Sequence, residues 1–237
     1  MPARSPASRP RAAARRTVLS VDVVILTPRD DRLAVLLLHA AAPHGRERRA
    51  LPWDGVRGAE TLDQAAARVA RSALGRAVGA LEQVAAFGDR RSHPSGADVS
   101  VAYVALAAPD VGHGLAAARG EPDWFALDAL PPVAARQRAM IDAAVRAVRM
   151  RLDHEPIAFR LLPSTFTLSE LQETYELLLE RRLHKASFRR ALQAARLVEP
   201  TEEWRSEGRG RPAQLFRYAP RKRRGGRHGV RFDRMGG

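Results

Sequence analysis

The segment at residues 51–75 constrains the fold of this chain more than any other. It reads LPWDGVRGAETLDQAAARVARSALG, a glycine-containing loop followed by a helical pattern and a closing glycine. Thr61 followed three residues later by Gln64 is a capping-box signature, so the helix is expected to begin at Thr61. Apolar residues then recur on one helical stripe: Leu62, Ala66, Val69 and Ala73. Gly75 is placed to end the helix. The segment therefore predicts a loop and a short helix that packs one face on a core.

The same segment resembles the Nudix box. Glu60, Arg68 and Gly75 fall on its frame, but three helix carboxylates of the family are replaced by Val69, Ser72 and Ala73. Nudix hydrolases hold Mg²⁺ or Mn²⁺ on these carboxylates, and hard cations need oxygen ligands. Glu60 and Asp63 remain, but two carboxylates at the start of the helix cannot rebuild the cluster. We predict a Nudix-like pocket without metal, cofactor or catalytic residues, in a chain that is not an enzyme.

Hydrophobic periodicity predicts the elements around this segment. Residues 17–27, 33–39, 81–87 and 99–107 are rich in β-branched or apolar residues and are expected to be strands. Residues 28–31 are expected to form a turn and residues 40–49 a polar loop. An Ala/Arg helix is expected at residues 133–152. Together they predict a mixed sheet flanked by helices, an α/β (α+β) domain that ends near residue 150.

A second pattern of helices begins after Pro156. Thr167 and Glu170 form another capping box, followed by an amphipathic helix. Residues 185–196 predict a second helix, with Phe188, Ala191 and Leu192 on its apolar side. A charged connection is expected at residues 199–200, a Gly/Arg hairpin tip at 208–212 and a closing strand at 214–218. Helix, turn, basic helix and hairpin is the order of a winged helix-turn-helix.

Positive charge is concentrated at the ends of the chain. The net charge is +14, yet residues 181–237 carry 17 Lys plus Arg against 5 Asp plus Glu, and the first 16 residues carry five Arg and no acid. This pattern favours a polyanion partner, nucleic acid first. The alternative is an Arg-rich chain from a GC-rich genome, since only Lys185 and Lys222 are lysines. The absence of Cys fits a reducing cytoplasm, and no apolar run has the length of a membrane span.

Both halves together resemble the NrtR-like family of Nudix-related transcriptional regulators. The matching stretches include VDVVILT, LPWDGVRGAETLDQAAAR, PIAFRLLPSTFTLSELQETYE and GRGRPAQLFRY. The resemblance implies a dimer that binds a palindromic operator in double-stranded DNA and responds to a nucleotide- or sugar-related ligand. It divides the chain into a disordered basic arm (1–16), a Nudix-like effector-sensing domain (17–152), a winged helix-turn-helix (153–220) and a disordered basic tail (221–237). Trp53 and Asp54 stand where the family has a glycine pair.

The resemblance places the second basic helix in the major groove. Its polar side chains would reach bases or phosphates, and they are Lys185, Ser187, Arg189 and Arg190. At the wing, Arg209 and Arg211 would enter a minor groove or contact phosphates. The alternatives are a solvated cationic helix face and an ordinary hairpin turn with incidental charge.

Two loops are expected to rim the former substrate cleft, at residues 53–60 and 89–98. The candidate ligand-binding residues in them and in the helix are Trp53, Arg57, Glu60, Arg68 and Arg91. Arginines there could hold a phosphate or carboxylate, and Trp53 could stack on a base or a sugar ring. Alternatively, Trp53 plugs the cleft and Arg68 forms a structural ion pair with Glu60. The seven His show no metal-binding spacing.

These patterns predict a cytoplasmic transcriptional regulator in which a ligand in the Nudix-like cleft shifts the geometry of a dimer. The helix at residues 133–152 joins the domains and is the expected lever. Two alternatives remain open: a divergent Nudix pyrophosphohydrolase with an appended nucleic-acid-binding domain, and a nonspecific nucleic-acid scaffold.

Overall fold

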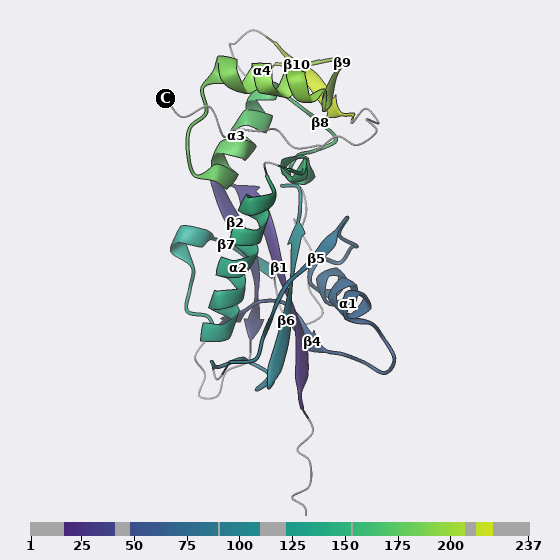
Figure 1. Ribbon diagram of the computed structural model, residues 1–237, viewed down its shortest axis with the longest axis vertical. Coiled ribbons are helices and arrows are strands. Elements are labelled where there is room, and N and C mark those ends of the chain that lie inside the picture. The colour runs from purple at the N-terminus through teal and green to yellow at the C-terminus, as the bar shows by residue number, and fades with distance from the viewer. Residues whose placement is uncertain are drawn as a thin grey trace, which may run out of the picture.

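The computed structural model of the chain describes residues 17–40, 48–89, 91–109, 122–152, 154–206 and 212–219. A large sheet stands at the centre, with one long helix on one face and one shorter helix on the other (Figure 1). A smaller domain of two helices and a second sheet caps one end of it. The predicted arm at 1–16, the tail at 221–237 and most of the hairpin tip lie outside the described residues.

The central sheet of the described residues has seven strands and is mixed. Their bounds are β1 Leu19–Arg29, β2 Arg32–Ala40, β3 Arg48–Ala50, β4 Trp53–Gly55, β5 Leu81–Phe87, β6 Val99–Leu106 and β7 Pro122–Ala126. The order is β3-β2-β1-β6-β5, with β4 added on β1 and β7 on β2. Only the β1–β6 pair is parallel among the pairs of this sheet in the described residues. The predicted mixed sheet is confirmed.

Two local predictions in this sheet were wrong. The turn after β1 is only two residues long, because Arg29 already pairs with Arg32. Asp30 and Asp31 form it with φ of 47° and 57°, the backbone of a hairpin turn that matches strand twist. The expected polar loop at 40–49 contains β2's last residue and most of β3. Three-residue strands such as β3 carry no alternation long enough to detect.

Helix α1 (Leu62–Leu74) forms as the capping box predicts. The Thr61 side chain accepts a hydrogen bond from the Gln64 N–H, and the Gln64 side chain accepts one from the Thr61 N–H. Gly75 ends the helix with φ of 69°, a conformation that glycine adopts without strain. The buried face of α1 includes Val69 and Ala73 and packs on the sheet together with Tyr103.

Helix α2 (Ala135–Arg151) covers the opposite face of the sheet (Figure 1). Ile141, Ala144, Val145 and Val148 are buried, as its periodicity predicts. The apolar cluster under α2 does not stop at the end of this domain. It continues through Phe159 and Tyr175 to Phe188 in the second domain. The two domains therefore share one core, and α2 contributes to both.

The second domain has the element order of a winged helix-turn-helix. Its elements are the 3₁₀ helix η3 Ile157–Leu161, β8 Thr165–Phe166, α3 Leu168–Leu179, α4 Lys185–Ala195, β9 Val198–Arg205 and β10 Ala213–Tyr218. The sheet order is β8-β10-β9, and the capping box at Thr167 is confirmed. The charged connection expected at residues 199–200 was wrong, because both residues lie in β9. Pro200 fits there because β9 is an edge strand and needs no donor on its outer side.

In the described part of the chain, no helix combines the length and the apolar character that crossing a membrane requires.

Candidate ligand cleft and nucleic-acid interface

Arg68 lies at the centre of the candidate cleft. Its guanidinium donates to Glu60 Oε2 at 3.1 Å, to Glu60 Oε1 at 2.5 Å and to the Gly55 carbonyl at 2.9 Å. The bond from Arg68 lowers the pKa of Glu60, and the bond to Glu60 raises the pKa of Arg68. The ion pair that was one of two expectations for Arg68 is thus confirmed. It fixes the loop before α1 to the helix.

Asp54, which stands in place of a family glycine, adds a second carboxylate to the cleft. Its Oδ2 accepts from Arg68 at 2.7 Å and from Arg57 at 2.5 Å. Two carboxylates therefore face two arginines, and the local charge is balanced. The cavity at this place is about 100 Å³. It is lined by Leu38, Pro52, Trp53, Asp54, Arg57, Arg68, Val69, Ser72 and Ala73.

The carboxylates near the cleft do not fit the magnesium cluster of a Nudix hydrolase. Val69 and Ala73 are buried apolar side chains, and Ser72 is exposed. Asp63 accepts a hydrogen bond from the Tyr103 hydroxyl at 2.6 Å. Burial and this bond to Asp63 raise the pKa of Tyr103 to about 12. Within the part of the chain that the structure describes, no group of three His, Cys, Asp or Glu side chains could hold a metal ion.

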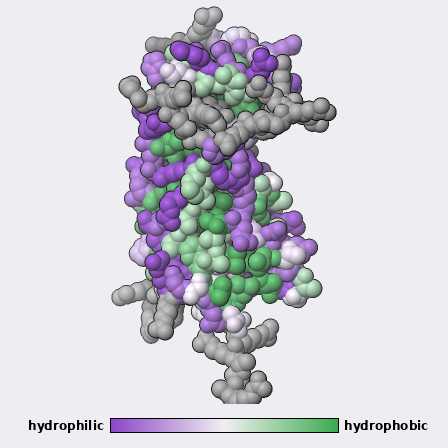
Figure 2. All heavy atoms as spheres, viewed as in Figure 1, coloured by the Kyte–Doolittle hydropathy of each residue, from purple (hydrophilic) through white to green (hydrophobic). Residues whose placement is uncertain are grey.

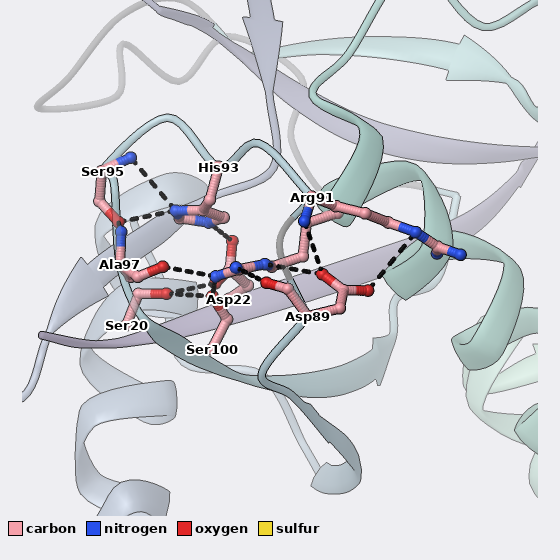
Figure 3. Close-up of polar contacts among 9 residues, drawn as sticks. Ser20, Asp22, Asp89, Arg91, His93, Ser95, Ala97 and Ser100 are labelled. Atoms are coloured by element: carbon pink, nitrogen blue, oxygen red, sulfur yellow. Dashed lines mark hydrogen bonds and ion pairs between the residues drawn. The ribbon is translucent and has the colours of Figure 1, made fainter. Parts of the chain in front are cut away.

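A buried polar network beside the cleft was not predicted from the sequence (Figure 3). Asp22 on β1 is fully buried, and its Oδ1 lies 2.8 Å from His93 Nε2. The same oxygen accepts from Gln137 Nε2 at 2.8 Å, while Oδ2 accepts from the Ser20 hydroxyl at 3.0 Å. The His93 ring meets Trp53 edge-on, with centroids 5.5 Å apart. One signal was available: Asp22 is the single charged residue in the mainly apolar segment 17–27.

Arg136 ties the loop at residues 89–98 to the start of α2. Its side chain is buried and donates to the Ala97 carbonyl at 2.6 Å, to Ser100 Oγ at 3.2 Å and to the Asp89 carbonyl. Arg91, expected to bind ligand, forms an exposed ion pair with Asp89 at 3.4 Å. It extends away from the Asp22–His93 pair in Figure 3 and does not line the cavity. Of the predicted ligand residues, the structure brings Trp53, Arg57 and Arg68 together at the cavity.

Helix α4 carries the predicted nucleic-acid contacts. Phe188 and Leu192 are buried, and the Phe188 ring packs against Tyr175 with centroids 5.7 Å apart. Lys185, Arg189 and Arg190 are exposed, whereas Ser187 is half-buried with its Oγ 3.3 Å from His184 Nδ1. Hydrophilic residues are spread over the visible face of the molecule, and at the end where α4 lies they stand beside apolar ones (Figure 2). The wing residues Arg209 and Arg211 lie outside the described residues.

The turn between α3 and α4 is held by Glu176. Its carboxylate accepts from the Leu183 N–H at 2.9 Å, from Gln172 at 2.8 Å and from Arg182 at 2.8 Å. Burial raises the pKa of Glu176, but these three bonds together outweigh it and the pKa is lowered. The end of α3 is also tied to α2, because Arg149 donates to the Leu178 carbonyl at 3.0 Å. Helix α2 thus contacts the network beside the candidate cleft through Gln137 at its start, and the helix-turn-helix through Arg149 at its end.

Comparison with known proteins finds relatives for the C-terminal part and for the chain as a whole. Residues 158–218 match the NrtR DNA-binding winged helix domain. Over 141 residues, the chain is 33% identical to a protein of Acinetobacter baylyi described as an ADPR responsive transcriptional repressor, NtrR. That match covers 59% of this chain and 56% of the relative, so it spans just over half of the relative's length.

Two solved structures have the same overall arrangement. NrtR of Shewanella oneidensis in complex with a 27mer DNA superimposes with a TM-score of 0.74 and 28% identity, over 85% of this chain and 94% of that one. A MutT/nudix family protein of Enterococcus faecalis, at 20% identity, shares the fold with a TM-score of 0.67 over 89% of this chain and 90% of that one. The C-terminal domain therefore matches the NrtR DNA-binding winged helix domain, and the chain as a whole is similar to NrtR and shares its fold with a MutT/nudix family protein.

Proposed function

We propose that this chain is a DNA-binding transcriptional repressor whose Nudix-fold domain senses a small molecule and carries out no catalysis. The observation that carries the proposal is the exposed basic face of α4, on a winged helix that shares one core with a cleft lacking the hydrolase carboxylates. Exposed arginines on a helix that packs by its other face can enter a major groove and contact phosphates or bases. Such a regulator acts on the chromosome, so we propose the cytoplasm as its location.

We propose a homodimer on a palindromic operator. A single winged helix reads one half-site, and two copies related by two-fold symmetry read two half-sites spaced by about one helical turn. The basic segments at both ends of the chain would add sequence-independent affinity that falls steeply with salt.

The proposed effector is nucleotide- or sugar-related, with ADP-ribose the first to test because one relative carries the description ADPR responsive. Binding requires the cleft to open, since its cavity is about 100 Å³ and ligand pockets usually measure roughly 300–1,000 Å³. An anionic group on the effector would compete with Asp54 and Glu60 for Arg57 and Arg68.

Opening of the cleft would change the contacts of α2 through the buried network. Trp53 contacts His93, His93 contacts Asp22, and Gln137 of α2 donates to the same carboxylate. Gln137 also accepts from the Leu51 N–H at 3.1 Å, directly before the cleft loop. A ligand that displaces this loop therefore changes contacts at the start of α2. A coupling of only about 1–3 kcal/mol suffices to change DNA affinity by roughly 5- to 150-fold.

Fluorescence anisotropy on duplexes from the DNA upstream of the gene tests the proposal. We expect a duplex that binds at least about 10³-fold more tightly than its scrambled version at physiological salt. We also expect the affinity to change when the effector is added. Equal affinity for both duplexes would contradict the regulator and support a nonspecific scaffold. Magnesium-dependent release of phosphate products from ADP-ribose, lost in Glu60→Gln, would instead support the pyrophosphohydrolase.

A further inference from the structure

The exposed basic residues of α4 lie at different angles around the helix axis. Successive residues of an α-helix are about 100° apart around the axis. Phe188 and Leu192 are the two fully buried side chains of α4 and define its inward direction. Arg190 lies about 180° from the mean direction of this pair. Arg190 therefore occupies the outermost position of α4 and is exposed.

Small side chains flank Arg190 along the same ridge. Ala186 lies one turn before it and Ala194 one turn after it, each about 40° from the outward direction, and both are exposed. Exposed Gln193 and half-buried Ser187 each lie about 60° from that direction, on opposite sides of it. The exposed side chains of the outermost face are thus one guanidinium and one amide beside two methyl groups. Two alanines let a helix approach the floor of a groove closely.

Arg189 belongs to a different face, although it is the next residue in the chain. It lies about 100° from the outward direction and lines a groove of about 440 Å³ between α4 and strands β9 and β10. Gln193, Arg196 and Pro200 line the same groove. Gln193 is about 40° nearer to the outward direction than Arg189, so it lies between the side of Arg190 and the side of Arg189. A cation on the flank of the helix meets the rim of a DNA groove, where the phosphates are, and not its floor.

We propose that Arg190 and Gln193 read base edges in the major groove, while Arg189 binds the phosphate backbone. This inference rests on the proposed DNA-binding function and names the part of it that sets specificity. Guanidinium groups pair with guanine O6 and N7, and a Gln amide pairs with adenine N6 and N7. The methyl groups of Ala186 and Ala194 match the thymine methyl. The preferred half-site therefore contains a G·C pair next to A·T pairs.

Arg189 and Arg190 form a matched pair for the test. Both are exposed arginines of α4, and they differ in their position around the helix axis. The full-length wild type first selects duplexes from a randomised library, which gives a preferred half-site. Arg189→Ala, Arg190→Ala and Gln193→Ala are then measured by anisotropy on the selected duplex and on each single-base variant, over a range of salt concentrations.

For Arg190→Ala we expect discrimination at one G·C pair to fall by roughly 5- to 150-fold. Gln193→Ala is expected to relax an A·T position in the same way. For Arg189→Ala we expect every duplex to lose affinity equally, so that base preference is unchanged. We also expect the slope of log affinity against log salt concentration to be smaller in magnitude by about 1. Uniform weakening by Arg190→Ala, or altered base preference in Arg189→Ala, would overturn the assignment.

Failure of this inference can be told apart from failure of the proposed function. If the wild type selects no motif, sequence-specific binding itself is absent and both fall. If it selects a motif that neither Arg190→Ala nor Gln193→Ala alters, the regulator stands and the assignment of these two residues is overturned. All three side chains are exposed, so unchanged thermal unfolding of each variant shows that the fold is intact.

Discussion

Substitution of Asp22 by Ala should destabilise the protein strongly, although Asp22 lies in neither proposed binding surface. The Asp22 side chain is fully buried and receives three hydrogen bonds from different parts of the chain. The partners are Ser20 on the same strand, His93 from the loop at 89–98 and Gln137 from α2. Removing the carboxylate leaves these three buried polar groups without their acceptor.

The expected loss in the free energy of unfolding follows from the number of hydrogen-bond partners of Asp22. A hydrogen bond to a charged group contributes about 1.5–3 kcal/mol, and breaking a buried charged contact by removing one partner costs about 3–5 kcal/mol. Such terms are not additive in one network, so we expect Asp22→Ala to lower the free energy of unfolding by about 3–5 kcal/mol. Asp22→Asn keeps the shape and one acceptor oxygen, and we expect it to cost about 1–2 kcal/mol.

Urea unfolding followed by tryptophan fluorescence measures this loss, and Trp53 is in contact with His93 of the network. Asp142→Ala is the matched control, because Asp142 is a half-exposed carboxylate that pairs with Arg138 on the same helix. We expect that control to stay within about 0.5 kcal/mol of wild type. An Asp22→Ala variant within about 1 kcal/mol of wild type, at unchanged urea dependence, would refute the account of the network as a structural link.

Three further predictions concern the cleft and the helix-turn-helix. Because Arg68 lowers the pKa of Glu60, the stabilisation by this pair is complete above the ordinary value of 4.5 and is lost as pH falls through the lowered pKa of the folded state. The melting temperature of wild type should therefore exceed that of Glu60→Gln at neutral pH and converge with it in acid; a constant gap would contradict this. Phe188→Ala should cost about 3–5 kcal/mol in denaturant unfolding, because the side chain is fully buried, while exposed Lys185→Ala should cost almost nothing. Millimolar Mg²⁺ should not shift the melting temperature, since the cleft carboxylates already bind arginines, and a clear rise would count against a cleft without a metal site.

Prediction from the sequence succeeded where a local rule decides the conformation. The capping boxes at Thr61 and Thr167 correctly gave the N-caps of α1 and α3, since a side chain three residues away completes each cap. Long periodic segments gave α2, α4 and the longer strands. The Arg68–Glu60 pair was foreseen because both residues belong to a recognisable pattern.

The parts of the fold and of the candidate site that were not predicted depend on tertiary contacts, which leave no local pattern in the sequence. Strands β3, β4 and β8 are too short to show alternation, and β9 contains Pro200 and several charges that resemble a loop. His93 reaches Asp22 across 71 residues of sequence. In α4, the candidate contacts were chosen by residue type, and the half-burial of Ser187 beside His184 was not predicted.

Helix α2 gives the two proposed functions a physical connection. Its 17 residues span about 25 Å, from the loop held by Arg136 to the end of α3 held by Arg149. Along this length α2 packs on the sheet through Met140, Ile141 and Ala144, and close-packed interiors transmit displacement instead of absorbing it. In the proposed mechanism, a shift of the start of α2 would therefore be passed on to the turn that precedes α4. Because α4 would have to fit a groove of fixed width and half-site spacing, a small change in its direction is enough to weaken operator binding.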